Sequence, residues 1–357
     1  MYTKRNTTKQ ALENHAFRGQ KTSNKNRTER HKKTAGFFCE LKNIMKNTIT
    51  PENNANHQAG AIAITLSNLA YSDKMDLSLQ LKLNYLPTGG NWKLVWFAEN
   101  KANLVYVVRE KESGQYAVAI RGSFGSLTTP ITFFEDWVVQ DFEVFKMVDW
   151  KYGEAPADAK VSEGSAKGLE SITSLTNKGL TLKQFFLKEV VEKRLPESLP
   201  IAVTGHSLGG ALCYMVAAYL YAKLKKHNIT RSIWPVSFAG PTSGNRVWAD
   251  WLVQQFKANL GRYFNQNDVV PHGWQDLKWV QTCFPDGGPK IPSKIEQNLI
   301  AFIKRDLHGV YVQPGEGIAL PGKIRPHFSW VEEIGYQHSS LHYLGLVTSK
   351  NSESIKS

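Results

Sequence analysis

The sequence predicts an α/β fold in which helices cover both faces of a mostly parallel central sheet. Short runs rich in Val, Ile and aromatic residues alternate along the chain with longer stretches of helical apolar period. Strands that alternate with helices form βαβ units, whose strands are parallel. The chain has 357 residues, 41% of them hydrophobic, which is enough for one substantial core. Ligands of such sheets bind at the carboxyl ends of the strands, so we expect the functional residues there.

The expected elements follow from these periodicities. The strands span 103–109, 115–121, 200–204, 233–238 and 261–265. The helices span 59–71, 163–175, 181–195, 208–224, 245–260, 330–336 and 339–347. Ser113 and Gly114 lie in the turn between the first two strands, which indicates a hairpin or neighbouring strands. Two Gly/Pro-rich stretches, 284–292 and 313–326, are interpreted as excursions from the core around the mouth of the site.

The positive charge is concentrated at the N-terminus. The formal net charge is +13, and residues 1–60 contribute +8 of it through 12 Lys and Arg against four acids. This region has no sustained apolar period, so we expect a basic disordered tail over 1–58, a folded domain over 59–349 and a short tail over 350–357. The tail is expected to contact an anionic membrane surface and not nucleic acid. A transit peptide and a solvated tail without a partner remain open alternatives.

The composition also limits the class of protein and its compartment. It excludes a wholly disordered chain, a collagen-like fibre and a small disulfide scaffold. We find no apolar run long enough for a transmembrane helix and no hydrophobic core of a general secretory signal peptide, so a soluble protein is expected. Its location stays open between an intracellular one and export by another route. The three cysteines indicate free thiols, because their number is odd.

The strongest functional signal is the sequence Gly205-His206-Ser207-Leu208-Gly209. It has the pattern G-x-S-x-G, follows an expected strand and opens an expected helix. In that context the serine occupies a strained turn that only small neighbours permit, with its hydroxyl above the sheet. The Leu208 backbone N–H would then stabilise a developing oxyanion. The alternative is a glycine-rich turn in which Ser207 only caps the helix.

A nucleophilic serine needs a base and a carboxylate that orients it, and in this fold they follow the serine in the order acid, then histidine. Asp268 follows the strand 261–265, whereas its rivals Asp276 and Asp286 follow no convincing strand. Asp268 could instead bond only to local backbone amides. Of the later histidines, His338 at a loop-to-helix junction is favoured over His342 inside a helix.

Further candidates surround these three residues. The second oxyanion donor is expected to be the backbone N–H of Ser123, which follows the strand 115–121. Aromatic and apolar side chains nearby are candidates for a lid or for an acyl pocket, with fixed core packing as the alternative. These are Phe124, Phe133, Phe134, Trp137, Val269 and Trp274. No His, Cys and Asp cluster has metal-ligand spacing, so neither a metal nor an organic cofactor is expected.

Together these motifs resemble the class 3 lipases, the family of fungal triacylglycerol lipases and their bacterial and plant relatives. The resemblance spans residues 92–347 and includes RGS at 121–123, GHSLGG at 205–210, FAGPTSGN at 238–245, NQNDVVP at 265–271 and HSSLHYL at 338–344. Glycine stands in the family where this chain has Ala239. The segment between Ser123 and Asp136 and the segment from Trp274 to Arg325 are both longer than in the fungal enzymes.

The resemblance implies an α/β-hydrolase fold, and we expect a bacterial-type member of the family. It implies hydrolysis of lipid carboxyl esters through an acyl-enzyme, with Ser207 as nucleophile, His338 as base and Asp268 as the acid that orients it. No obligate protein partner is inferred. A phospholipase or an acyltransferase with the same triad is the nearer alternative. A catalytically silent interaction module with the same fold is the alternative from another class.

Overall fold

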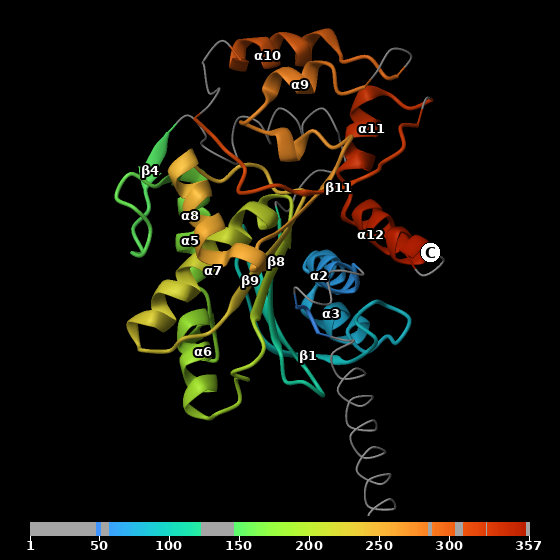
Figure 1. Cartoon of the computed structure of the whole chain (residues 1–357). Coiled ribbons are helices and arrows are strands. Elements are labelled where there is room, and N and C mark those ends of the chain that lie inside the picture. Colours follow the sequence, from blue (N-terminus) through green and yellow to red (C-terminus); the bar gives the residue numbers. More distant parts are fainter. Residues whose placement is uncertain are drawn as a thin grey trace, which may run out of the picture. The chain divides into compact units, whose positions relative to one another are not determined.

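A seven-stranded sheet with the order β1-β2-β3-β8-β9-β10-β11 forms the centre of the molecule (Figure 1). The computed structural model describes residues 48–50, 57–122, 146–284, 288–303, 310–325 and 327–354. The strands are β1 (Trp92–Glu99), β2 (Leu104–Glu110), β3 (Tyr116–Ile120), β8 (Ile201–His206), β9 (Ile233–Phe238), β10 (Gly261–Asn265) and β11 (Ile318–Leu320). β1, β2 and β3 pair antiparallel, and every pairing from β3 to β11 is parallel. This confirms the mostly parallel sheet.

Helices cover both faces of this sheet. One face carries α2 (Gln58–Leu69), α3 (Lys74–Gln80) and α12 (Ser340–Ser354). The other carries α5 (Glu163–Ser174), α6 (Leu182–Val191), α7 (Leu208–Lys226) and α8 (Arg246–Phe256), and Figure 1 shows the two groups on opposite sides of the strands. The fold is that of an α/β hydrolase. Two small antiparallel pairs accompany it: β4 (Met147–Asp149) with β5 (Lys160–Ser162), and β6 (Thr176–Asn177) with β7 (Leu180–Thr181).

The alternation of side chains along the strands separates the core into two clusters. In β2, Val105 and Val107 belong to the cluster under α5 to α8, whereas Tyr106 and Val108 belong to the cluster under α2 and α12. Successive residues of a strand point to opposite faces, so a strand that is covered on both sides must be apolar at every position. β3, β8 and β9 are buried along their whole length, as this arrangement requires.

A third apolar cluster is formed by the chain after β10. It includes the turn η3 (Val270–His272) and the helices α9 (Leu277–Gln281), α10 (Ser293–Ile303) and α11 (Trp330–Gln337). Figure 1 shows these helices gathered beyond one end of the sheet strands. Ser329 begins α11 with a capping box, in which its hydroxyl accepts from the Glu332 N–H and the Glu332 carboxylate accepts from the Ser329 backbone. The position of α11 places its last residue beside the carboxyl ends of the strands.

Two strands of the central sheet differ from the expectation. Residues 313–326 were interpreted as an excursion, but Ile318–Leu320 form β11 and extend the parallel sheet. β11 has only three residues, which is too short for a periodic signal. β1 was not expected. The burial of its side chains does not alternate along the strand, and its pairing with β2 is irregular between Leu94 and Trp96. In both cases pairing with a neighbouring strand determines the structure.

The described residues near the termini adjoin the folded unit. Ile49 is buried, and its backbone N–H and carbonyl both bond to the side chain of Gln115. These contacts attach a segment upstream of residue 59 to the folded unit. α12 continues to Ser354, into the segment that was expected as a short tail. Searched over the described part of the chain, the helices include none with the length and apolar character of a membrane span.

Candidate active site

Ser207 lies in a strained turn between β8 and α7. Its backbone has φ 62° and ψ −130°, a conformation that residues other than glycine rarely adopt. The Ser207 N–H bonds to the Phe238 carbonyl at 3.0 Å, which ties the turn to the end of the neighbouring strand β9. The Ser207 side chain makes no capping bond to α7. The alternative in which Ser207 is only a helix cap therefore does not describe this turn.

The two flanking glycines are required by close backbone contacts. A Cβ at Gly205 would lie 2.2 Å from the carbonyl oxygen of Gly209. A Cβ at Gly209 would lie 2.3 Å from the carbonyl oxygen of Ile120 at the end of β3. These distances are far below van der Waals contact, so neither position can hold a larger residue without movement of the backbone. The small residues let α7 start directly beneath the turn.

The structure brings Ser207, His338 and Asp268 into one chain of hydrogen bonds. The Ser207 Oγ lies 2.9 Å from His338 Nε2, and His338 Nδ1 lies 2.9 Å from Asp268 Oδ2. His338 occupies the junction between α11 and α12, as its sequence context indicated. Ser207, His338 and Asp268 are 5%, 3% and 0% exposed, so their mutual bonds are protected from competing water. A carboxylate accepts at Nδ1, which leaves Nε2 free to accept from the serine hydroxyl.

Asp268 is held by two further donors. The Val270 N–H bonds to Oδ1 at 3.0 Å, and the Tyr343 hydroxyl donates to Oδ2 at 2.8 Å. The Tyr343 oxygen in turn accepts from the Asn265 N–H at 2.8 Å. Burial, and then the charge of Asp268, raise the pKa of Tyr343 well above its ordinary value, so the phenol keeps the proton that it donates. Hydrogen bonds from Val270, Tyr343 and His338 hold the carboxylate from three sides.

The rival candidates lie elsewhere. Asp276 accepts from the Trp279 N–H and caps α9. Asp286 lies outside the described residues. His342 packs against Tyr336 with ring centroids 4.2 Å apart, and His272 stacks on Trp279 at 3.8 Å. None of these side chains has a bond to Ser207 among the described contacts.

His206 was considered only as a member of the turn, but its ring is bound on both sides. Its Nε2 lies 2.7 Å from the backbone carbonyl oxygen of His338, and its Nδ1 lies 3.0 Å from the Tyr71 hydroxyl. Burial, and secondarily the neighbouring His338, lower the pKa of His206 well below its ordinary value. The ring is therefore neutral near pH 7. Neither Tyr71 nor Tyr343 was assigned a role. Tyr343 stands in the HSSLHYL motif, whereas Tyr71 at the end of a helix has no distinctive pattern.

The candidates for oxyanion binding and for the lid fall into two groups. Leu208 is the first residue of α7, and the first N–H groups of a helix have no intrahelical acceptor. Ser123 and the aromatic residues Phe124, Phe133, Phe134 and Trp137 lie outside the described residues. Val269 and Trp274 are each 1% exposed and belong to the third apolar cluster. Neither lines the small hollow between β4–β5 and α5.

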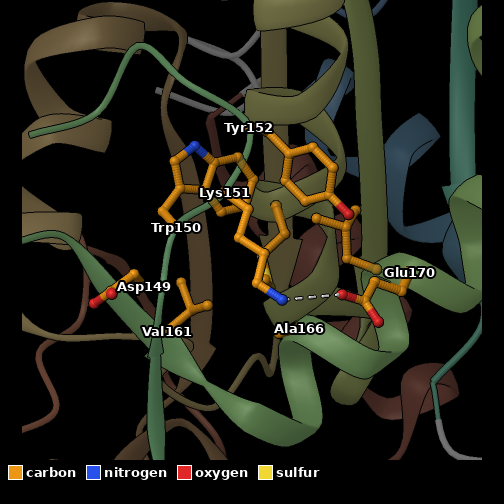
Figure 2. A pocket seen from close by; sticks show the side chains of 9 residues that line it. Asp149, Trp150, Lys151, Tyr152, Val161, Ala166 and Glu170 are labelled. Carbon is orange, nitrogen blue, oxygen red and sulfur yellow. Dashed lines mark ion pairs between the residues drawn. The ribbon is translucent and has the colours of Figure 1, made fainter. Parts of the chain in front are cut away.

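A small hollow lies away from these residues, between the β4–β5 pair and α5. Figure 2 shows Trp150 and Tyr152 on one side and Ala166 on α5 on the other, with the Lys151–Glu170 ion pair of 3.6 Å across it. It contains none of the predicted site residues. Over the described residues there is also no group of three or more His, Cys, Asp and Glu side chains that could hold a metal ion.

Comparison with known proteins finds a family to which part of this chain is similar. Residues 117–276 match the profile of the family described as Lipase (class 3). Over 151 residues the chain is 28% identical to the chloroplastic phospholipase A(1) DAD1 of Arabidopsis thaliana. Over 93 residues it is 32% identical to the triacylglycerol lipase OBL1 of the same plant. The residues that match the family profile include the Ser207 turn and Asp268, and they end before His338.

The extent of these similarities differs between sequence and structure. The DAD1 match covers 42% of this chain and 32% of DAD1, and the OBL1 match covers 24% of this chain and 18% of OBL1. The solved structure of M37 lipase aligns with a TM-score of 0.68 at 24% identity, and covers 84% of this chain and 97% of that one. Each sequence match to a relative therefore covers less than half of the chain, while the similarity of fold extends over most of it.

Proposed function

Since the chain belongs to the class 3 lipase family, we propose that it hydrolyses carboxylic ester bonds of lipids, with Ser207 as nucleophile, His338 as general base and Asp268 as the carboxylate that orients the base. The main support is the pair of 2.9 Å contacts that His338 makes with Ser207 and Asp268. Base and nucleophile are within the range that proton transfer needs, and the base is held by a third group.

The proposed reaction has two halves. Ser207 Oγ attacks the ester carbonyl while His338 Nε2 takes its proton, and Asp268 stabilises the imidazolium. The oxyanion accepts the Leu208 N–H at the positive end of α7. The imidazolium then protonates the leaving alkoxide. In the second half, water that His338 deprotonates attacks the acyl-enzyme and releases the fatty acid, and Ser207 regains its proton.

The test is covalent labelling of the folded protein with a fluorophosphonate, followed by mapping of the modified peptide. We expect the label on Ser207, and we expect Ser207→Ala to abolish both labelling and hydrolysis of a short-chain ester. The activity loss should be several orders of magnitude. Retention of more than about a tenth of the activity would contradict the assignment of the nucleophile. Absence of labelling in folded wild-type protein would favour the silent interaction module.

A phospholipase is the second candidate, because the relative DAD1 is a phospholipase A(1). The same nucleophile would attack either class of ester, so the difference depends on how the head group is accommodated. Emulsified triacylglycerol and a phosphatidylcholine of the same acyl chains should be compared at equal surface area, with a soluble short-chain ester as the common reference. Addition of an acceptor alcohol would reveal transfer of the acyl group in place of hydrolysis.

The basic N-terminal region is proposed to draw the enzyme to anionic lipid surfaces. Residues 1–46 hold 12 Lys and Arg against three acids, and such charge is attracted to anionic head groups over about 8 Å at physiological salt. Deletion of residues 1–46 leaves the buried segment 48–50 in place. We expect weaker binding to anionic vesicles at low salt, unchanged binding to neutral ones and unchanged hydrolysis of a soluble ester. Loss of the soluble activity would mean that this region supports the fold.

A further inference from the structure

Three parts of the site meet at the side chains of Tyr71 and His206. Tyr71 follows α2, two residues beyond its end at Leu69. Its hydroxyl lies 3.0 Å from His206 Nδ1 and against Gly122, where an added Cβ would lie 2.6 Å from the Tyr71 oxygen. Gly122 belongs to the loop that follows β3. His206 Nε2 lies 2.7 Å from the carbonyl oxygen of His338. One hydrogen-bonded chain therefore links the end of α2, the Ser207 turn and the α11–α12 junction, and the β3 loop lies against it.

The chemistry of the partners fixes the direction of every bond in this chain. A carbonyl oxygen only accepts, so His206 carries its proton on Nε2 and donates it to His338. Nδ1 of the neutral ring is then an acceptor, and the Tyr71 hydroxyl must donate to it. The His206 carbonyl oxygen is a second, longer acceptor for the same hydroxyl, at 3.5 Å. A single tautomer of His206 therefore satisfies the whole chain.

The neutral charge of His206 suits its place beside the base. The rings of His206 and His338 have centroids 4.8 Å apart. A cation at His206 would repel the imidazolium that His338 becomes when it accepts the serine proton. The donor on Tyr71 and the acceptor on His338 instead hold His206 in its neutral form.

We propose that Tyr71 and His206 act as a positioning pair, which sets the distance between the Ser207 turn, the His338 junction and the Gly122 backbone without contact with the reacting atoms. The inference rests on the proposed function. A displacement of about 1 Å between a nucleophile and its base can reduce a rate about a hundredfold, so these bonds bear on kcat. Gly122 fits closely here, because a Cβ on it would lie 2.6 Å from the Tyr71 oxygen.

The helix that supplies Tyr71 is itself fixed to the same elements. Ser67 of α2 bonds to Thr204 of β8 at 2.9 Å, and Asn68 accepts from the Ser340 hydroxyl at 2.7 Å. Ser340 lies two residues after His338. The end of α2 thus contacts both the strand that carries the nucleophile and the helix that follows the base. This anchoring gives Tyr71 a defined position from which to orient the His206 ring.

The experiment compares Tyr71→Phe with a control substitution, Tyr106→Phe, at another tyrosine that contacts α2. Tyr106 is fully buried, and its hydroxyl donates to the Leu66 carbonyl of α2. Tyr106→Phe therefore removes a bond to α2 that is not part of the chain through His206. For Tyr71→Phe we expect kcat on a soluble short-chain ester to fall about tenfold, the loss of one bond worth about 1.4 kcal/mol, with KM within about twofold. For Tyr106→Phe we expect unchanged kcat and a similar or larger fall in Tm.

Substitutions of His206 test the other member of the pair. His206→Gln keeps one donor and one acceptor, so it should retain more activity than His206→Ala. In the double variant Tyr71→Phe with His206→Ala, the loss should be smaller than the product of the two single losses, because both changes break the same chain.

The outcomes separate this inference from the proposed function. If wild-type protein is labelled at Ser207 and Tyr71→Phe keeps kcat within twofold, the positioning pair is wrong and the proposed function stands. Strictly multiplicative losses in the double variant would also overturn the pair. If wild-type protein is neither labelled nor active, the proposed function is wrong and the inference falls with it.

Discussion

The nucleophile side of the candidate site and its acid-base side are built in different ways. The Ser207 turn is a continuous stretch of chain in which β8, Ser207 and α7 follow one another directly. The acid-base side combines Asp268 after β10, His338 at the end of α11 and Tyr343 inside α12. The comparison shows that backbone strain leaves a mark in the sequence, because it demands glycines at fixed positions. Hydrogen bonds between distant segments leave no such mark in the sequence.

The largest expected effect is on the acid-base side. Asp268→Asn keeps the size of the side chain but offers His338 Nδ1 an amide group, which favours the wrong tautomer. We expect kcat on a soluble ester to fall about 10³- to 10⁴-fold, with a small change in Tm. The control is Asp276→Asn, because Asp276 caps α9 and an asparagine caps equally well. A loss of less than tenfold for Asp268→Asn would mean that the acid is another residue.

A substitution on the nucleophile side should instead act by destabilising the fold. Gly209→Ala places a Cβ 2.3 Å from the Ile120 carbonyl oxygen, so β3 and α7 must separate. We expect the free energy of unfolding to fall by about 3 kcal/mol, measured by denaturant titration. Gly335→Ala is the control, since a Cβ at Gly335 in α11 meets nothing within 4 Å. Helix propensity should leave that variant equal or slightly more stable. Equal stability of both variants would show that the turn has room to adjust.

A smaller effect is expected from the support of the acid. Tyr343→Phe removes the hydroxyl that donates to Asp268, and it leaves the buried Asn265 N–H without its acceptor. We expect kcat to fall about tenfold together with a loss of stability of about 1–3 kcal/mol. Tyr214→Phe is the control, because the buried Tyr214 hydroxyl bonds only to the Gly261 carbonyl among the described contacts. If both variants lose stability and both keep full kcat, Tyr343 supports the fold and not the carboxylate.

The smallest expected effect is a pH dependence of folding stability. It comes from His206, which belongs to the Ser207 turn and bonds to His338 on the acid-base side. The pKa of His206 is lowered in the folded state, so below about pH 6.5 the unfolded chain binds a proton that the folded one excludes. Stability therefore falls as the pH falls, by at most about 1.4 kcal/mol per pH unit from this group. Burial also lowers the pKa values of His272 and His342, which add to the same acid loss.

The contribution of His206 can be separated by substitution. The unfolding free energy should be measured between pH 8 and 5 for the wild type and for His206→Gln, with His227→Gln at an exposed position as the control. We expect a shallower slope only for His206→Gln, whatever its absolute stability. Identical slopes for all three proteins would mean that the folded protein accommodates the His206 proton.

Much of the fold could be predicted, because the relevant signals are local. The hairpin of β2 and β3, the strands β8 to β10 and the helix that starts after Ser207 follow from periodicity and from turn residues. β1 and β11 could not be predicted in this way, since their pairing partners stabilise strands with weak patterns of their own. The position of His338 at a loop-to-helix junction favoured it over His342, and the resemblance to a known family pointed to the same residue.

The sequence by itself determined the mostly parallel sheet, the strained turn at Ser207 and the order of the serine, the acid and the histidine. These features depend on residues that are close together in the chain, where glycine, strand and helix preferences act directly. Only the tertiary structure decided that Asp268 and Tyr343 meet His338, and that Tyr71 and His206 connect the turn to the base. Such contacts depend on where packing places the ends of α2, α11 and α12, because a hydrogen bond is made by position and not by spacing along the chain.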